Sequence, residues 1–196
     1  FGFVYTVKHR NSGKMYLVKQ ITPFAAKNDE EKIQNEENIR SKMMNHPNIA
    51  KFYCTMVSHK NDVYFLFEYL EGDTLENKIS QRHKDRGMEV DKPAFRVDEI
   101  QKIARDIFNA LSSLHGKQTP FIHRDVRPAT IFVTKDQAKL FDFGISKPIN
   151  NKGQLTLTSD VICNYAAPEV FRPNTHYGKY VDFFSLGLTV YTMEIG

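Results

Sequence analysis

Two aspartates in the middle of the chain stand where a phosphoryl-transfer site would need carboxylates. Asp125 ends the triplet His-Arg-Asp, and Asp142 begins the triplet Asp-Phe-Gly. Phosphoryl transfer needs metal ions held against the phosphates, positive charge nearby and a group that accepts the proton of the nucleophile. Asp142 is a candidate Mg²⁺ ligand because Mg²⁺ prefers carboxylate oxygens, and Asp125 is a candidate base. Either triplet alone is merely a turn, whereas the two in this order are specific.

The segments around these aspartates predict the strands that hold them. Residues 131–134 and 139–141 have strand-like sequences joined by a turn at 135–137, so an acid lies near each end of a predicted hairpin. Alternating apolar residues predict further hairpins nearer the N-terminus, the first with Asn-Ser-Gly as its turn. These predicted strands cover 4–10, 15–21, 50–57 and 63–67.

Helical periodicity begins after residue 75. One apolar stripe has clear helical spacing and predicts an amphipathic helix. Its members are Ile100, Ile103, Ala104, Ile107, Phe108, Leu111 and Leu114. Residues 181–195 are apolar almost all round, which indicates a buried helix. The charged segment 82–93 has no periodicity and is expected to be a surface loop.

Composition excludes several classes of protein. The 196 residues are 41% apolar and 26% charged, which is an ordinary globular composition. The 27 basic residues are scattered among 23 acidic ones, so no nucleic-acid partner is expected. Cys54 and Cys163 have neither the spacing nor the neighbours of a zinc site or disulfide, which favours an intracellular, cytoplasmic location. The longest apolar run, 63–67, is far too short for a membrane segment.

The motifs resemble, in order and spacing, the signature set of eukaryotic protein kinases. Besides the two acidic triplets, residues 16–19 are similar to the strand that carries the phosphate-binding lysine, and 167–169 match the Ala-Pro-Glu motif. The resemblance covers essentially the whole chain. It implies an α+β, bilobal fold, in which an N-lobe at 1–67 combines a small antiparallel sheet with one helix. A hinge at 68–73 and a mainly helical C-lobe at 74–196 would follow, truncated at both ends and without the C-terminal helices.

Within this family the chain looks most like the NIMA-related serine/threonine kinases. The segments that carry this preference are 71–75, the charged loop after it, 131–134 and 143–147. Serine/threonine specificity is also favoured because no tyrosine-kinase pattern of alanines and arginine follows Asp125. The resemblance implies ATP and Mg²⁺, with Mn²⁺ as an alternative, and a protein substrate; it indicates no oligomeric state.

The resemblance also implies a role for each residue that matches a family motif. The catalytic residues would be Asp125, Lys19 and Arg127, the last in place of the usual lysine that contacts the transferred phosphate. The ATP-binding residues would be Gly2, Val4, Lys19, Glu37, Glu68, Leu70 and Phe132. The metal ligands would be Asp142 and Thr130. Structural or regulatory residues would be His123, Arg124, Phe143, Gly144, Glu169 and Asp182, and possible phosphorylation sites are Thr156, Thr158 and Ser159.

The partner of Lys19 is expected on a helix predicted over 28–44. An ammonium group in the middle of an apolar strand needs such a partner. The resemblance to protein kinases favours Glu37, because its offset from the His-Pro-Asn-Ile motif is the one that this family usually shows, and Glu36 is the alternative. One position along a helix rotates a side chain by about 100°, so only one of the two can face Lys19.

Several departures from the family pattern leave the activity open. Thr130 stands where the family has an asparagine, and its oxygen lies closer to the backbone than an amide oxygen, so a weakened second metal site is expected. Leu17 would crowd the adenine pocket, and Val161 with Ile162 removes a hydroxyl expected near the catalytic aspartate. Two hypotheses follow: an active serine/threonine kinase, or a pseudokinase that binds nucleotide or acts as a scaffold. A small-molecule kinase of the aminoglycoside or choline type ranks last, because those enzymes generally lack the Ala-Pro-Glu segment.

Overall fold

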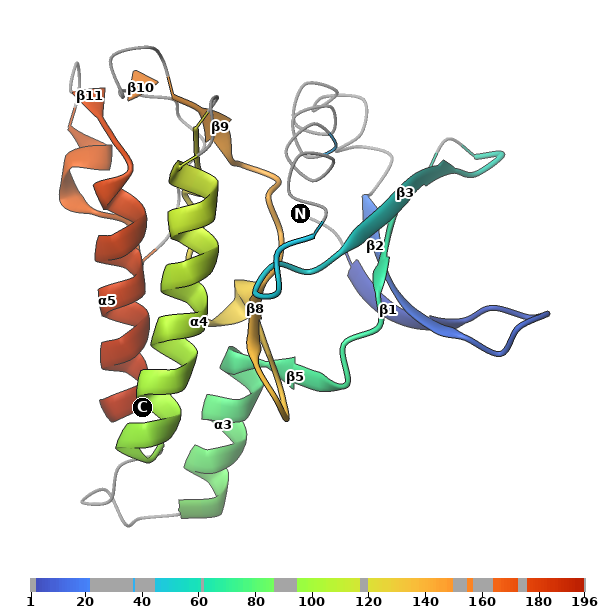
Figure 1. Ribbon diagram of the computed structural model, residues 1–196, viewed down its shortest axis with the longest axis horizontal. Coiled ribbons are helices and arrows are strands. Elements are labelled where there is room, and N and C mark those ends of the chain that lie inside the picture. Colours follow the sequence, from blue (N-terminus) through green and yellow to red (C-terminus); the bar gives the residue numbers. More distant parts are fainter. Residues whose placement is uncertain are drawn as a thin grey trace.

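An antiparallel sheet lies on one side of the molecule and a mainly helical part on the other (Figure 1). The structure is a computed structural model that describes residues 3–21, 37, 45–60, 62–86, 95–116, 120–149, 155–156, 164–172 and 176–195. The α+β architecture expected from the sequence is confirmed. The predicted boundaries of the lobes and the hinge stay predictions. The helix predicted over 28–44 lies outside the described residues except for Glu37, which is helical.

The N-terminal sheet has four antiparallel strands in the order β1-β2-β4-β3. They are β1 (Phe3–Lys8), β2 (Met15–Ile21), β3 (Phe52–Val57) and β4 (Val63–Glu68). Both predicted hairpins are confirmed, with ends that differ by one or two residues. β3 begins at Phe52 rather than Ala50, because the N–H of Ala50 donates to the carbonyl of Leu140 instead of to a sheet neighbour.

A second, smaller sheet connects this part to the helices. Its strands are β5 (Gly72–Thr74), β7 (Ile131–Thr134) and β8 (Ala138–Leu140), in the order β5-β7-β8. A Cβ on Gly72 would collide with the carbonyl of Val133, so only glycine allows this close strand approach. Asn48 holds the other edge, since its Nδ2 donates to the carbonyl of Ala138 at 3.1 Å and its own carbonyl accepts from Leu140 at 2.8 Å.

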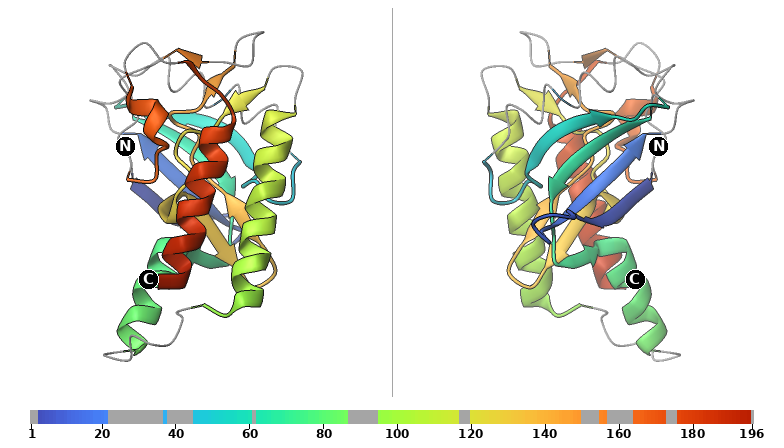
Figure 2. Two further views of the ribbon diagram at one scale, coloured as in Figure 1. Left: turned by 90° about the vertical axis from the view of Figure 1, so that its left-hand side faces the viewer. Right: turned by 90° about the vertical axis from the view of Figure 1, so that its right-hand side faces the viewer.

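Among the residues that the structure describes, the helical part contains the α-helices α3 (Leu75–Arg86), α4 (Val97–His115) and α5 (Tyr180–Ile195). Helices α4 and α5 lie side by side, and the views in Figures 1 and 2 agree on this. Within the described residues, no helix has the length and apolar character needed to cross a membrane.

The buried apolar stripe of α4 is confirmed, except that Phe108, which was predicted to belong to it, is exposed. Phe108 is 51% exposed, and its ring centroid lies 5.3 Å from that of Phe183. The helix predicted to be buried over 181–195 is buried on one face only. The buried face of α5 contains Asp182, Ser185 and Thr189, whereas the other face exposes large apolar side chains, among them Phe184 and Tyr191.

Residues 82–86 belong to α3, so the surface loop predicted for 82–93 is wrong over this part. The cause is tertiary. The guanidinium group of Arg82 lies 3.9 Å from the ring centroid of Phe95. It also donates two hydrogen bonds to the carboxylate of Glu99, at 2.8 and 3.0 Å. These contacts extend α3 to a last turn that has no apolar periodicity of its own.

Candidate active site

The first acidic triplet lies on a loop between β6 (Phe121–Ile122) and the 3₁₀ helix η1 (Pro128–Thr130). Asp182 is completely buried and accepts hydrogen bonds from the backbone N–H groups of His123 at 2.9 Å and Arg124 at 2.8 Å. Nε2 of His115, at the end of α4, lies 2.7 Å from the same carboxylate. Because both oxygens have donors, this buried carboxylate ties the loop to α4 and α5.

Two residues that are not glycine have a left-handed backbone in the described chain, and each belongs to one of the triplets. They are Arg124, with φ of 71°, and Asp142, with φ of 68°. Such conformations cost about 1–3 kcal/mol and persist where the surroundings over-determine them. Arg124 is held through its N–H on Asp182. The carboxylate of Asp142 accepts from the N–H of Gly144 at 3.0 Å.

Asp125 is half-buried and paired with an arginine. Its Oδ1 lies 2.7 Å from Nε of Arg127. Burial raises the pKa of the Asp125 carboxyl above its ordinary value; the negative charge of Asp142 adds to this, while Arg127 and His123 oppose it. A carboxylate with a raised pKa is a better proton acceptor at neutral pH than an ordinary aspartate.

Thr130 is buried beneath the same loop. Its hydroxyl lies 2.6 Å from the carbonyl oxygen of Asp125 and 3.0 Å from that of Arg127, and it accepts from the N–H of Arg127 at 3.2 Å. A hydroxyl has a single proton to donate. Thr130 therefore positions the turn that carries Asp125 and Arg127. Its role as a metal ligand stays a prediction.

The second triplet is connected to the N-terminal sheet through Lys19 in β2. Nζ of Lys19 lies 2.6 Å from Oδ1 of Asp142, and the lysine side chain is only 3% exposed. A buried ammonium group requires such a partner. Glu37 is half-buried on its helix. Its pairing with Lys19 stays a prediction, and the alternative, Glu36, lies outside the described residues.

The two triplets are packed against each other. The ring of Phe143 is almost completely buried, and its centroid lies 4.8 Å from that of His123 in an edge-on arrangement. The hydroxyl of Ser146 donates to the carbonyl of His123 at 3.1 Å. Strand β9 (Lys147–Pro148) then pairs with β6, on the other side of the same loop. These contacts fix the two carboxylates relative to each other.

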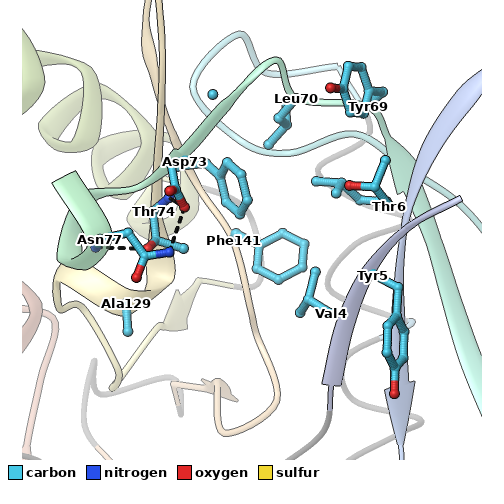
Figure 3. Close-up of a pocket in the computed structure, with 13 residues that line it drawn as sticks. Val4, Tyr5, Thr6, Tyr69, Leu70, Asp73, Thr74, Asn77, Ala129 and Phe141 are labelled. Carbon is cyan, nitrogen blue, oxygen red and sulfur yellow. Dashed lines mark hydrogen bonds between the residues drawn. The ribbon is translucent and has the colours of Figure 1, made fainter. Parts of the chain in front are cut away.

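A cleft of about 450 Å³ runs between the N-terminal sheet and the helical part (Figure 3). Val4, Leu70 and Phe132, which the sequence predicted to bind ATP, line this cleft together with Leu17. Its wall also contains Ala129 and Phe141, the sequence neighbours of Thr130 and Asp142. The cleft therefore adjoins the residues that could do chemistry.

Sequence reasoning did not name Phe141 or the polar end of this cleft. The ring of Phe141 lies 4.9 Å from that of Phe67 and 6.0 Å from that of Phe132. At the polar end, Asp73 Oδ1 accepts from the N–H of Thr74 at 2.7 Å and from Nδ2 of Asn77 at 2.8 Å (Figure 3). The available signal was the capping pattern of an acid and a threonine just before a helix.

Glu68 is not among the described residues that line the cleft. Its carboxylate accepts from Nζ of Lys139 at 2.5 Å and from the N–H of Lys51 at 2.8 Å, so it links the end of β4 to β8. The predicted contact of its backbone with adenine stays a prediction.

The remaining predicted residues lie away from the cleft or outside the described chain. Glu169 is half-buried in the 3₁₀ helix η2 (Pro168–Phe171). Thr156 belongs to β10 (Leu155–Thr156), which pairs with β11 (His176–Tyr177). Those outside the described residues are Gly2, Thr158, Ser159, Val161 and Ile162.

The donor set fits a Mg²⁺ ion held largely by a nucleotide. Within the described residues there is no group of three or more His, Cys, Asp or Glu side chains that could bind a metal by themselves. Mg²⁺ is usually bound by one or two carboxylates together with substrate phosphates. Asp142, whose side chain is 27% exposed, can supply such a carboxylate beside the cleft.

The sheet, the cleft and the two packed triplets together have the architecture of a protein kinase domain. The whole chain, residues 1–196, matches the family model of the protein kinase domain. The chain therefore belongs to the protein kinase family, and the resemblance stated from its motifs is confirmed.

Several serine/threonine kinases are similar in sequence. Serine/threonine-protein kinase Nek5 of Homo sapiens is 29% identical over 98% of this chain and 26% of its own length. Cyclin-dependent kinase F-4 of Oryza sativa is 32% identical over 95% of this chain and 38% of its own length. Aurora kinase of Debaryomyces hansenii is 32% identical over 100% of this chain and 45% of its own length. The chain thus spans less than half of each relative.

Proposed function

We propose that this chain transfers the γ-phosphate of ATP to serine or threonine hydroxyls of a protein. The observation that carries the proposal is the buried ion pair between Lys19 and Asp142 at 2.6 Å. This pair places a cation and a carboxylate next to Phe141 in the cleft wall. Phosphoryl transfer depends on such charges held in place, because the protein has little covalent chemistry to perform.

The roles of the side chains follow from their positions. The substrate hydroxyl attacks the γ-phosphorus and gives its proton to Asp125, and the bond from phosphorus to the bridging oxygen breaks as ADP leaves. Arg127, bonded to Asp125, orients this carboxylate and brings positive charge towards the transferred group. Lys19 and Asp142 would hold the phosphates and the Mg²⁺, which neutralises phosphate charge when it is bound. The similarity to serine/threonine-protein kinase Nek5 supports the choice of hydroxyl.

A second function, that of a nucleotide-binding pseudokinase, is favoured by Thr130. The Thr130 hydroxyl is buried and bonded to the loop backbone, whereas the asparagine of the family also ligates a second metal. If the first metal site alone is intact, nucleotide binds but transfer is slow. The two functions share a cleft and differ in turnover.

The test measures transfer and binding separately. Transfer is followed with γ-labelled ATP, Mg²⁺ or Mn²⁺, and a general serine- and threonine-rich protein substrate. Binding is measured as the rise in the melting temperature of the protein when the nucleotide is added. We expect Asp125→Asn to abolish transfer but keep the nucleotide-induced rise, and Lys19→Met to lose both. Asp136→Asn, an exposed acid in the turn after β7, is the matched control and should keep both.

Two outcomes would contradict the kinase proposal. If wild-type protein binds nucleotide but labels no substrate and not itself with either metal, the pseudokinase function replaces it. If Asp125→Asn transfers phosphate at the wild-type rate, the assignment of the base is wrong.

A further inference from the structure

The register of the N-terminal sheet assigns each residue to one of two faces. Paired residues of an antiparallel sheet share a face. The rungs Val4–Lys19–Phe65 and Thr6–Leu17–Phe67 belong to the inner face, where the cleft and the buried phenylalanines lie. The opposite side, called the outer face below, consists of Phe3–Gln20–Tyr64–Met56, Tyr5–Val18–Leu66–Cys54, Val7–Tyr16–Glu68 and, at the bulge of β3, Tyr53.

The outer face is unusually apolar for a surface that contacts water. Tyr5 is 43% exposed, Met56 40%, Tyr53 39% and Val7 36%. A sheet face towards solvent normally carries polar side chains in alternation with the core. Contiguous exposed apolar side chains of this kind mark interaction sites in soluble proteins.

Positive charge is concentrated at one end of the outer face. Nζ of Lys14 lies 5.5 Å from the ring centroid of Tyr16, and Nζ of Lys51 lies 5.6 Å from that of Tyr53. Neither ammonium group forms an ion pair with any carboxylate of the described chain. Glu68 stands at the same end of the face, where its carboxylate pairs with the ammonium group of Lys139 and accepts from the backbone N–H of Lys51.

We propose that the outer face docks an acidic peptide segment that also bears aromatic or aliphatic side chains. Its carboxylates would pair with Lys14 and Lys51, and its apolar side chains would cover Tyr5, Met56 and Tyr53. The opposite end of the face carries an acid, since the Asp62 carboxylate lies 3.5 Å from the hydroxyl of Tyr64. This polarity gives the peptide a preferred direction, with its acidic end over the lysines.

A peptide fits the outer face better than a nucleic acid. Nucleic-acid sites need a stripe of basic residues that follows the phosphates. Here two lysines stand beside Glu68 at one end of an apolar surface, and Asp62 stands at the other end. Tyr5 borders both the outer face and the cleft, whereas Lys14, Lys51, Tyr53 and Met56 do not line the cleft, so substitutions at the two lysines and Tyr53 test docking separately from the phosphotransfer activity.

The experiment measures fluorescence anisotropy of a short labelled peptide in which glutamates alternate with phenylalanine and leucine. We expect saturable binding that weakens as salt is added. The double variant Lys14→Glu with Lys51→Glu should reduce the affinity roughly tenfold, since two exposed pairs are turned into repulsions. The neutral double variant Lys14→Gln with Lys51→Gln should have a smaller effect in the same direction.

Controls separate the site from a general charge effect. Lys135→Glu, an equally exposed lysine in the turn after β7, should leave the affinity within about twofold. Tyr53→Ser should weaken binding without changing its salt dependence. Circular dichroism melts verify that each variant is folded.

Three results would overturn the proposal. The first is equal affinity of the wild type and both lysine variants for the acidic peptide. The second is tighter binding of a single-stranded oligonucleotide than of the peptide, with the same lysines required. The third is self-association of the chain in sedimentation that Tyr53→Ser abolishes, which would make a second copy the occupant.

Discussion

Replacement of Asp182 by alanine should remove much of the stability of the protein. The Asp182 carboxylate is completely buried and is the acceptor for three donors, at 2.7, 2.8 and 2.9 Å. Each donor left without a partner costs about 1–3 kcal/mol. Partial relaxation reduces the sum, so we expect a loss of about 3–5 kcal/mol in the free energy of unfolding. This is a large fraction of the roughly 5–15 kcal/mol that holds a typical domain together.

The backbone of the loop makes this loss hard to avoid. Arg124 has φ of 71°, and its N–H is one of the three donors. Without the carboxylate, the strained backbone would relax and carry Asp125 with it. Asp182→Asn should also be costly, because an amide has one acceptor oxygen where the carboxylate has two, so its NH₂ group must face a donor.

The assay is urea unfolding followed by circular dichroism, because the chain has no tryptophan for fluorescence. Ser185→Ala is the matched control on the same helix. Ser185 is also buried, but it donates only to the carbonyl of Val181 one turn earlier, so its removal should cost less than about 1 kcal/mol. A loss for Asp182→Ala no larger than that for Ser185→Ala would refute the anchoring role of the carboxylate.

Three further predictions concern the pair on α3 and α4, the catalytic loop and the cleft. Hydrogen bonds from Arg82 lower the pKa of Glu99 from 4.5 to about 2, so the pair stabilises the fold above about pH 4.5 and this stability is lost as the pH falls towards 2. The side chains of Glu99 and Arg82 are 30% and 35% exposed, so solvent screening reduces the contribution of the pair to the free energy of unfolding to about 1 kcal/mol. In urea unfolding, Glu99→Gln should therefore make the free energy of unfolding less dependent on pH between pH 4.5 and 2. Thr130→Asn should raise phosphate transfer without changing the nucleotide-induced melting shift, and an unchanged rate in an already active protein would remove the case for a weak metal site. Leu17→Ala should enlarge the cleft and increase the nucleotide-induced melting shift. It should also lower the melting temperature of the free protein, because truncation of a buried leucine reduces the free energy of unfolding by about 2–4 kcal/mol. No increase in the shift would show that Leu17 does not restrict the nucleotide.

The sequence predicted the elements whose signals are local. Strands β1, β2 and β4 and helix α4 were predicted within a few residues, because alternation and helical periodicity are properties of neighbouring positions. The family was predicted for a similar reason, since its motifs are short runs in a set order. Errors arose where a distant contact decided the outcome. Helix α3 continues to Arg86 because Arg82 contacts Phe95 and Glu99, and no local pattern shows this.

The chemistry of the chain was therefore determined by its sequence, and the geometry of the site by its tertiary structure. Asp125, Asp142 and Lys19 could be named from residue types in order, because few side chains can hold a metal or accept a proton beside phosphates. Tertiary structure alone decided that the Thr130 hydroxyl bonds to the loop backbone and that Phe141 lines the cleft. Such contacts depend on the packing of segments far apart in the chain, which the spacing of residues does not specify.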